Sequence, residues 1–271
     1  MHRSGTTLLS KILQDAGVFM GRRLEKNQES LFFLRFNGWM LKQAHCSWDN
    51  VANYKYVSKE FHKRLADIYK RYQGSITSIR YLGFKNYLRV GKVNNLDCHW
   101  GWKDPRNSIT LNFWKKIYPK AQFLHIYRNP MDVALSLKKR AMQSQIDYES
   151  DATARLKERL LFGEVGYSNS YRVIDIKEGY KLWKDYVTPC VSEDGVYQIK
   201  YEELVSSPFA VLQEMFHHIG IGVGPGGIES ISNQIDASRG FAFLENEEAC
   251  DYYNKIKGEA LLGQLGYSQI L

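Results

Sequence analysis

The sequence predicts an α/β fold with a central parallel sheet flanked by helices, in a single domain that spans residues 1–271. Short apolar stretches of strand length alternate with stretches in which apolar residues recur at helical spacing. Strands that alternate with helices in this way usually form a parallel, doubly wound sheet. No internal repeat, low-complexity tract or linker rich in Pro, Gly or Ser divides the chain, which favours one continuous domain.

The individual elements follow from the spacing of apolar residues and from turn-forming residues between them. A first helix is expected at 8–16, and further helices at 29–41, 57–72, 108–117, 130–137, 155–162, 172–186, 209–219 and 245–265. The expected strands are 100–103, 122–127 and 196–201. Residues 75–84 fit either a strand or an irregular segment, and the glycine-rich run 220–227 predicts a loop.

The first segment of the chain, residues 3–8, has the properties of an anion site. It consists of Arg-Ser-Gly-Thr-Thr-Leu and leads directly into the first expected helix. The start of a helix leaves backbone N–H groups unpaired and carries the positive end of the helix dipole. Ser4, Thr6 and Thr7 add hydroxyl groups, and Arg3 adds a full charge. A capped surface helix without any ligand explains these residues equally well.

This segment differs from the Walker A loop in a way that matters for chemistry. That loop needs a Lys directly after its second Gly, and here no Lys follows Gly5 before Lys11. The segment is therefore suited to phosphate but poorly equipped for ATP and its metal ion. Phosphate loops also follow a strand, and only two residues precede Arg3. We therefore expect a chain whose first strand is truncated, with a short apolar strand encoded upstream.

A second anion site is expected where the strand 122–127 ends. Arg128 follows this strand, Asn129 is a preferred helix cap, and Pro130 suits the first position of the next helix. In open α/β sheets, ligands bind outside the carboxyl ends of the strands. Ser136 lies two turns into this helix and, taken alone, is typical of a solvent-facing residue.

Composition narrows the classes of partner and location. The net charge of +8 and the isoelectric point near 9.1 indicate an anionic partner, which could be nucleic acid, a membrane surface or a polyanionic small molecule. The four cysteines are scattered and form no C-x-x-C pair or cluster with histidine, so no metal site is expected. The sequence has no apolar run of 18 residues and no secretory leader pattern, which predicts a cytoplasmic protein without a transmembrane segment.

Four sequence elements, taken in order, give the chain a family resemblance. They are Arg-Ser-Gly-Thr-Thr-Leu at 3–8, Lys-Asp-Pro-Arg at 103–106, Tyr-Arg-Asn-Pro-x-Asp-Val-x-x-Ser at 127–136 and Tyr-Glu-Glu-Leu-x-x-x-Pro at 201–208. Together they resemble the sulfotransferases that use 3′-phosphoadenosine-5′-phosphosulfate (PAPS) as the sulfuryl donor. The resemblance covers nearly the whole chain. It implies a three-layer P-loop-type fold, with its first strand truncated here, and a reaction that needs no metal ion.

The resemblance implies which residues bind the donor. The loop that would cradle the 5′-phosphosulfate consists of Arg3, Ser4, Gly5, Thr6, Thr7 and Leu8. Arg128 and Ser136 would bind the 3′-phosphate, and Tyr201 would lie near the adenine. Arg239 would belong to a basic C-terminal element that closes over the 3′-phosphate.

The resemblance also implies the catalytic groups. Lys103 matches the Lys of the family's Lys-Asp-Pro element and would stabilise charge on the leaving phosphate oxygen. Cytosolic members place a His two residues after this Lys, but Pro105 stands there, so another residue must be the base. Glu29 and Glu25 both lie shortly after the first helix, as the Glu of Golgi-type and bacterial members does. We favour Glu29, which opens a helical segment, and keep Glu25 open because of its spacing from the loop.

The sequence thus predicts a PAPS-dependent sulfotransferase that moves a sulfuryl group to a hydroxyl or amine acceptor by in-line displacement. The expected partner is a hydroxyl-bearing acceptor (a sugar, phenol, lipid or peptide), a homodimer stays open, and no nucleic acid is expected. His99 and His125 are expected to be packed strand residues. The alternatives are a P-loop kinase of small metabolites, a basic nucleic-acid-binding protein, and a sulfotransferase fold that only binds ligand.

Overall fold

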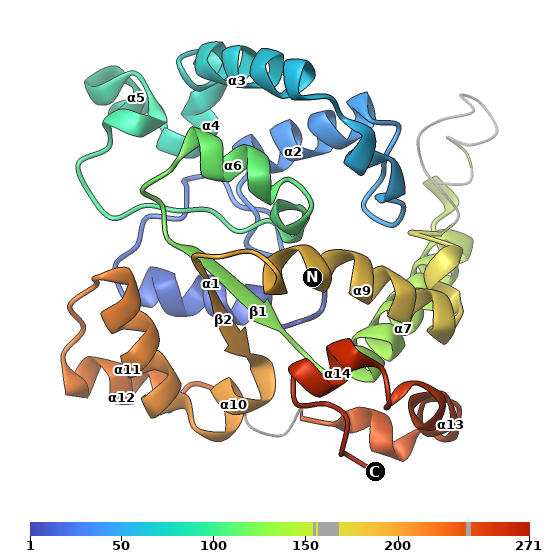
Figure 1. The fold of residues 1–271 in the computed structure, drawn as a ribbon. Coiled ribbons are helices and arrows are strands. Elements are labelled where there is room, and N and C mark those ends of the chain that lie inside the picture. The colour runs from blue at the N-terminus through green and yellow to red at the C-terminus, as the bar shows by residue number, and fades with distance from the viewer. Residues whose placement is uncertain (154–155, 157–167, 237–239) are drawn as a thin grey trace.

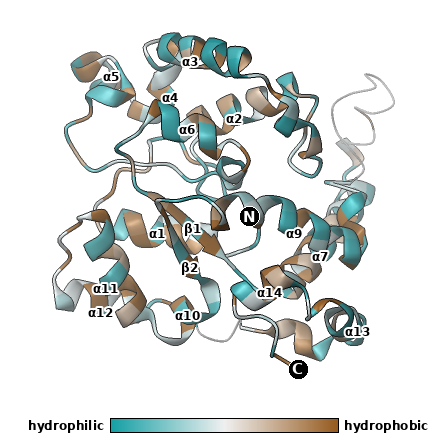
Figure 2. Ribbon diagram, in the orientation of Figure 1, coloured by the Kyte–Doolittle hydropathy of each residue, from teal (hydrophilic) through white to brown (hydrophobic). Residues whose placement is uncertain are grey.

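A computed structural model describes residues 1–153, 156, 168–236 and 240–271. These residues form a helix-rich α/β structure around a small parallel sheet (Figure 1). Strand β1 (Phe123–Tyr127) pairs with β2 (Val196–Lys200) in parallel, and Phe123 lies opposite Val196. Both strands lie where the sequence predicts them. Figure 2 shows hydrophobic residues along β1, in keeping with its place in the interior.

The helices fall into three groups, each with its own apolar core, and the sheet lies where the groups meet (Figure 1). The first group packs beside the sheet and contains α1 (Thr6–Asp15), α10 (Tyr201–Ser206), α11 (Pro208–Ile219) and α12 (Pro225–Ser232). The second contains α2 (Leu31–Gln43), α3 (Lys59–Gln73), α4 (Ile79–Leu82), α5 (Phe84–Val90) and α6 (Leu111–Ile117). The third contains α7 (Pro130–Ser150), α9 (Ile176–Val191), α13 (Glu247–Ile256) and α14 (Ala260–Gln264). Short 3-10 helices lie at Ala52–Tyr56, Ile76–Ser78, Val93–Asn95, Pro105–Ser108, Arg172–Ile174 and Ala242–Glu245.

Four sequence predictions about these elements are wrong in whole or in part, and a fifth cannot be compared. The loop expected at 220–227 ends at Gly224, because Pro225 begins α12. The single helix expected at 245–265 is divided into α13 and α14, with Gly258 between them. Residues 75–84 are helical rather than strand-like or irregular, because the turn Ile76–Ser78 continues into α4 until Gly83, with a φ of 73°, ends the helix. Within the described residues, the predicted strand 100–103 forms no ladder and is paired by a single parallel bridge between Phe19 and Trp100. The helix expected at 155–162 lies outside the described residues, except for Leu156.

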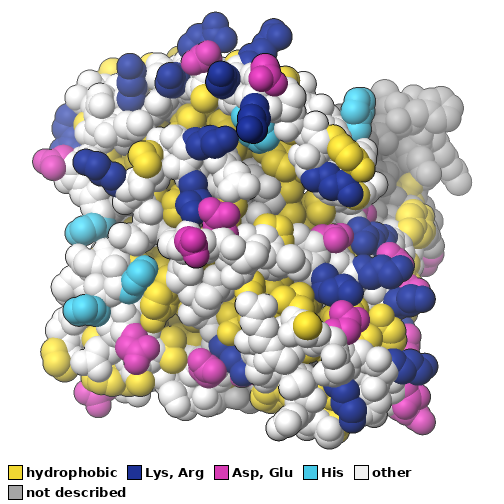
Figure 3. All heavy atoms as spheres, in the orientation of Figure 1, with side chains coloured by type: hydrophobic (Ala, Val, Ile, Leu, Met, Phe, Trp, Pro, Cys, Tyr) yellow, Lys and Arg dark blue, Asp and Glu magenta, His cyan; other side chains and the backbone are white. Residues whose placement is uncertain are grey.

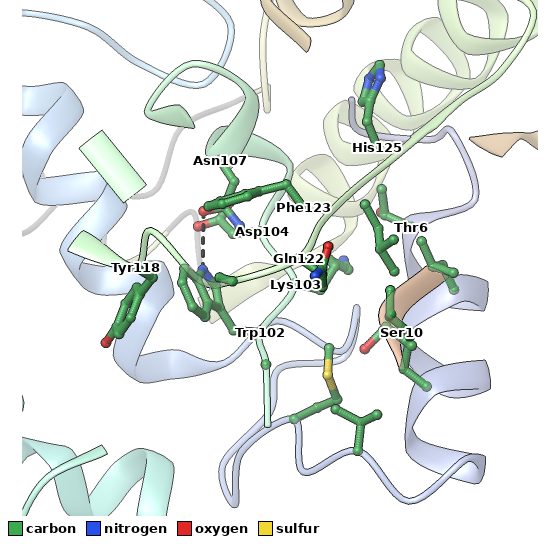
Figure 4. A pocket seen from close by; sticks show the side chains of 18 of the residues that line it. Thr6, Ser10, Trp102, Lys103, Asp104, Asn107, Tyr118, Gln122, Phe123 and His125 are labelled. Atoms are coloured by element: carbon green, nitrogen blue, oxygen red, sulfur yellow. Dashed lines mark hydrogen bonds between the residues drawn. The ribbon is translucent and has the colours of Figure 1, made fainter. Parts of the chain in front are cut away.

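A cavity of about 740 Å³ lies between β1 and the extended segment that contains Trp100 (Figure 4). Consecutive residues of both segments, 98–104 and 123–126, line it. Neighbouring side chains of a strand point to opposite faces of the sheet. A cavity above one face would therefore contact every second residue, whereas a cavity at the edge of the strand contacts consecutive residues. The sheet of the described residues has two strands, so the edge of β1 opposite β2 faces this cavity.

Candidate active site

Residues 3–8 form a tight turn that begins α1 beside the carboxyl end of β1. Gly5 precedes the helix with a φ of 88°, and a Cβ atom there would lie 2.5 Å from Cδ2 of Tyr201 and 3.1 Å from Cδ1 of Ile126. Only glycine fits both the conformation and the space. The Leu9 N–H donates the first helical bond to the Gly5 carbonyl oxygen at 3.0 Å. The N–H groups before Leu9 therefore have no acceptor within the helix, which is the geometry that binds phosphate.

The hydroxyl groups of this turn have different surroundings. Ser4 is fully buried, and its Oγ atom has no hydrogen-bond partner among the described residues. Thr7 Oγ1 instead donates to the carbonyl oxygen of Asn27 at 3.2 Å, which ties the turn to the loop before α2. A buried hydroxyl without a partner is unfavourable, and a ligand oxygen would satisfy it. Ser4 is therefore the hydroxyl of this turn that best fits an oxyanion.

Arg3 and Ser136 meet in the folded chain. The Nε atom of Arg3 donates to Oγ of Ser136 at 2.7 Å, across 133 residues of sequence. Arg3 has a φ of 67°, a left-handed conformation that is costly for a residue with a side chain and is often found in binding sites. The contact joins the turn 3–8 to the second turn of α7. Ser136 thus belongs to the same site as the turn, although its position in the sequence alone is typical of a solvent-facing residue.

Arg128 lies at the carboxyl end of β1, between α7 and Tyr201. Its guanidinium group pairs with Asp132 at 3.0 Å and lies 4.7 Å from the centre of the Tyr201 ring. Burial raises the pKa of Asp132, and the charge of Arg128 opposes that shift. Because the Tyr201 ring also packs against Gly5, one aromatic ring links Arg128 to the turn. The ends of β1 and β2 and the start of α1 therefore converge, as ligand sites of parallel sheets do.

Arg140 is a residue of this site that the sequence reasoning missed. It lies four residues after Ser136 on α7, so the two side chains lie on the same side of the helix. Its guanidinium group is 4.8 Å from the centre of the Trp48 ring, and its buried Nε atom has no partner among the described residues. Burial, followed by the charge of Arg3, lowers the pKa of Arg140. A guanidinium group with an unpartnered, buried Nε atom is suited to bind an anionic ligand. The four-residue spacing from Ser136 is the sequence feature that could have identified Arg140 as part of the site.

Glu202, also missed, holds the start of α7 against the end of β2. One of its carboxylate oxygens accepts a bond from the Asn129 N–H at 2.8 Å, and the other accepts from the Tyr267 hydroxyl at 2.6 Å. The side-chain oxygen of Asn129 in turn caps α7 by accepting from the Met131 N–H at 2.9 Å. Glu202 is thus a positioning residue, because it fixes the backbone next to Arg128.

Glu29 and Lys103 form a buried ion pair. Oε1 of Glu29 lies 3.1 Å from Nζ of Lys103, and the two side chains are only 9% and 10% exposed. Burial raises the pKa of Glu29 and lowers the pKa of Lys103, and each charge opposes the shift of the other. Figure 4 shows Lys103 lining the same cavity as Thr6 and Ser10 of α1. The structure therefore brings the predicted base and the predicted Lys together, close to the first turn of α1.

Glu25 lies at the other end of the turn that carries Glu29. The Glu25 N–H donates to the Glu29 carbonyl oxygen at 2.9 Å, and Gln28 has a φ of 63° within this turn. The Glu25 side chain is exposed, and its charge weakly opposes the lowering of the pKa of Lys103 by burial. Among the ion pairs of the described residues, the carboxylate that pairs with Lys103 is that of Glu29.

The residues after Lys103 anchor it to α2. Asp104 accepts two side-chain bonds from Arg106, with Nε at 2.9 Å and Nη2 at 2.8 Å, and a third from Nδ2 of Asn37 at 2.8 Å. Arg106 also donates to the carbonyl oxygen of Leu34 at 2.9 Å. Paired, hydrogen-bonded groups of this kind are well ordered when buried. Asp104 and Arg106 therefore keep Lys103 beside Glu29, which lies two residues before α2.

The other residues considered in the sequence analysis lie outside the site described above. His125 is buried in β1, with Nδ1 2.7 Å from Oε1 of Gln198, and burial lowers its pKa to about 3, so the prediction of a packed residue is confirmed. His99 is exposed, and the same prediction is wrong for it, because its segment lies at the molecular surface. Arg239 lies outside the described residues. In the described part of the chain, no group of three or more His, Cys, Asp or Glu residues could hold a metal ion.

None of the helices in the described ranges is both long and apolar enough to cross a bilayer.

The chain belongs to the sulfotransferase family, because the family's sequence profile matches residues 1–225. This match contains the turn 3–8, the Glu29–Lys103 pair, Arg128, Ser136 and Tyr201. Two curated relatives carry the name omega-hydroxy-beta-dihydromenaquinone-9 sulfotransferase Stf3, one from Mycobacterium bovis and one from Mycobacterium tuberculosis. Each is 26% identical over 123 residues, which is 44% of this chain and 28% of the relative. No solved structure matches this chain significantly.

Proposed function

We propose that the chain transfers a sulfuryl group from PAPS to a hydroxyl or amine acceptor. The observation that carries this proposal is the buried Glu29–Lys103 pair, 3.1 Å apart, next to a turn whose free N–H groups suit a phosphate. In a displacement at sulfur, a general base takes the proton of the acceptor, and a nearby cation stabilises the charge on the departing oxygen. The family to which the chain belongs supports sulfuryl transfer in general.

The residues around the turn fit the two phosphate-bearing ends of PAPS. We assign the 5′-phosphosulfate to the N–H groups of the turn 3–8 and to the unpartnered hydroxyl of Ser4. We assign the 3′-phosphate to the guanidinium groups of Arg128 and Arg140, with Ser136 held nearby by Arg3. Tyr201 would lie beside the adenine, and Arg239 remains a predicted part of the closing element.

The chemistry that follows from these assignments is an in-line displacement. The acceptor oxygen forms a bond to sulfur, the bond between sulfur and the 5′-phosphate oxygen breaks, and the acceptor proton goes to a carboxylate oxygen of Glu29. Lys103 stabilises the negative charge that develops on the departing adenosine 3′,5′-bisphosphate. Burial raises the pKa of Glu29, which makes its carboxylate a better proton acceptor than an exposed one. Glu25 remains the second candidate for the base.

The class of acceptor is the least constrained part of the proposal. The two curated relatives are named for an omega-hydroxylated menaquinone. A hydroxyl-bearing lipid is therefore the first acceptor to test, before sugars, phenols and peptides. The cytoplasmic location and a homodimer stay predictions from the sequence.

An assay with labelled donor tests the proposal. The purified chain is incubated with sulfur-labelled PAPS, each acceptor class in turn, and EDTA. We expect label on one acceptor and release of adenosine 3′,5′-bisphosphate, with no need for magnesium. Transfer from ATP that depends on magnesium, together with no transfer from PAPS, would instead identify the alternative kinase.

A further inference from the structure

One stretch of the second helical group is rich in positive charge, although Lys70 at its start pairs with Asp67 at 3.5 Å. Residues 68–96 contain six Lys and Arg residues and no Asp or Glu, whereas the whole chain has 37 basic and 29 acidic residues. The six are Lys70, Arg71, Arg80, Lys85, Arg89 and Lys92. They lie on the end of α3, on α4, and on and after α5. Figure 3 shows many Lys and Arg side chains, with a few Asp or Glu side chains among them, at the upper end of the molecule, where Figure 1 places α3 and α5.

The same stretch exposes large apolar side chains. Ile76, Phe84 and Leu88 are 72%, 65% and 69% exposed. Phe84 and Leu88 are four residues apart on α5 and therefore lie on the same side of that helix. Lys85 and Arg89 directly follow them and are exposed as well. Single exposed apolar residues are ordinary, but three in one short basic stretch indicate an interaction surface.

Backbone hydrogen bonds place this stretch beside the loop that carries Glu29. The Arg22 N–H donates to the Tyr81 carbonyl oxygen at 2.7 Å, and the Arg23 N–H donates to the Arg80 carbonyl oxygen at 3.0 Å. Arg22 and Arg23 are exposed and add two further positive charges. We call these residues the basic apolar surface, which comprises Arg22, Arg23, Ile76, Arg80, Phe84, Lys85, Leu88 and Arg89.

We propose that the basic apolar surface docks the protein on an anionic lipid bilayer. Basic side chains close to such a bilayer are attracted by its negative surface potential, and apolar side chains enter the boundary between headgroups and acyl chains. Neither contribution alone holds a protein firmly, and this surface provides both. Single-stranded nucleic acid would favour stacked aromatic side chains, whereas two of the three exposed apolar residues here are aliphatic.

Docking in this way has a consequence for the acceptor. The Arg23 carbonyl oxygen accepts a bond from the Leu31 N–H at 3.1 Å, so the basic apolar surface is continuous with both sides of the turn that carries Glu29. A hydroxyl group at a membrane surface would therefore meet the protein on the side of its proposed base. This consequence rests on the proposed function, whereas the docking itself does not.

Vesicle co-sedimentation of the full chain tests the proposal. Vesicles of phosphatidylcholine alone are compared with vesicles that also contain phosphatidylglycerol. We expect binding to the anionic vesicles, weaker binding as salt rises, and little binding to the neutral vesicles. The double variant Lys85→Glu/Arg89→Glu and the double variant Phe84→Ser/Leu88→Ser should each lower vesicle affinity at least about tenfold.

Two matched variants control for charge and for exposed apolar area. Lys177→Glu/Lys255→Glu changes the net charge equally on α9 and α13, and Met142→Ser/Ile146→Ser removes two exposed apolar side chains of α7. Both should bind vesicles like the unaltered chain. Equal losses in the controls, no binding to anionic vesicles, or binding to single-stranded DNA in place of vesicles would each overturn the proposal. Circular dichroism and thermal unfolding show that each variant is folded, and their result depends neither on docking nor on the proposed donor.

Discussion

The two ends of the candidate site differ in how their charges are balanced. At one end, a single carboxylate and a single ammonium group, Glu29 and Lys103, are buried together. At the other end, Arg3 donates to Ser136, Arg128 pairs with Asp132, and the Nε atom of Arg140 has no partner among the described residues. A balanced pair can take up or release a proton during a reaction, whereas several guanidinium groups in one site attract a phosphate. Changes at the first end should therefore affect turnover, and changes at the second should affect donor binding.

The largest expected effect is that of Glu29→Gln. Loss of a general base lowers turnover by about 10²- to 10⁴-fold, while the affinity for adenosine 3′,5′-bisphosphate should stay unchanged because Glu29 lies outside the cationic end. Turnover is measured with labelled PAPS, and affinity is measured by calorimetry. Glu25→Gln is the matched control and should keep most of the activity. If Glu25→Gln abolishes transfer and Glu29→Gln does not, the assignment of the base is reversed.

The next effect is on binding at the cationic end. Arg128→Ala should weaken binding of adenosine 3′,5′-bisphosphate by about 1.5–3 kcal/mol, or roughly 10- to 150-fold, because a charge-assisted contact is lost. Lys139→Ala, an exposed cation on the same helix, is the control and should change the affinity little. Equal losses in both variants would show that general charge, not this site, attracts the ligand.

A substitution at Arg140 should affect the affinity for the bisphosphate but not lower the free energy of unfolding. Arg140→Met should weaken binding of the bisphosphate by roughly tenfold, yet leave the free energy of unfolding unchanged or raised, because it removes a half-buried charge whose buried Nε atom has no partner among the described residues. Arg128→Met should lower the free energy of unfolding, because it leaves Asp132 buried without its partner. Chemical denaturation of both variants measures this difference. A lower stability of Arg140→Met with unchanged binding would make Arg140 a structural residue.

The smallest effect is a shift in the pH dependence of transfer. Glu29 must be deprotonated to accept a proton, so activity should rise with pH through its pKa, which burial raises above the ordinary value of 4.5. The charge of Lys103 opposes this shift, so Lys103→Met should move the acid limb of kcat/KM to higher pH in the residual activity. An acid limb that moves to lower pH, or does not move, would show that the charge of Lys103 does not lower the pKa of the catalytic base.

The sequence predicts the local features of this molecule well, because short-range physical chemistry determines them. The positions of the two strands, the Asn129 cap of α7 and the glycine turn before α1 all depend on residues close in sequence. The helical conformation of 75–84 was harder to predict, because its turns are stabilised by packing of Tyr81 and Leu82 into the second helical core. Short apolar runs without a clear period leave strand and helix equally open.

The contacts that build the candidate site could not be predicted from the residues alone. The Arg3–Ser136 bond and the Glu29–Lys103 pair join residues that are far apart in sequence. The family resemblance named these residues, but it gave no reason for Arg140 or Glu202, whose roles depend on burial and on their neighbours in space.

The central claim is that the turn 3–8 and the arginines around it bind a nucleotide with a 3′-phosphate, without help from a metal ion. Calorimetric titration of adenosine 3′,5′-bisphosphate into the chain, in the presence of EDTA, tests this most directly. We predict saturable binding at a single site that magnesium does not strengthen and that Arg128→Ala weakens. Absence of binding, or binding of ATP with magnesium but not of the bisphosphate, would contradict the account.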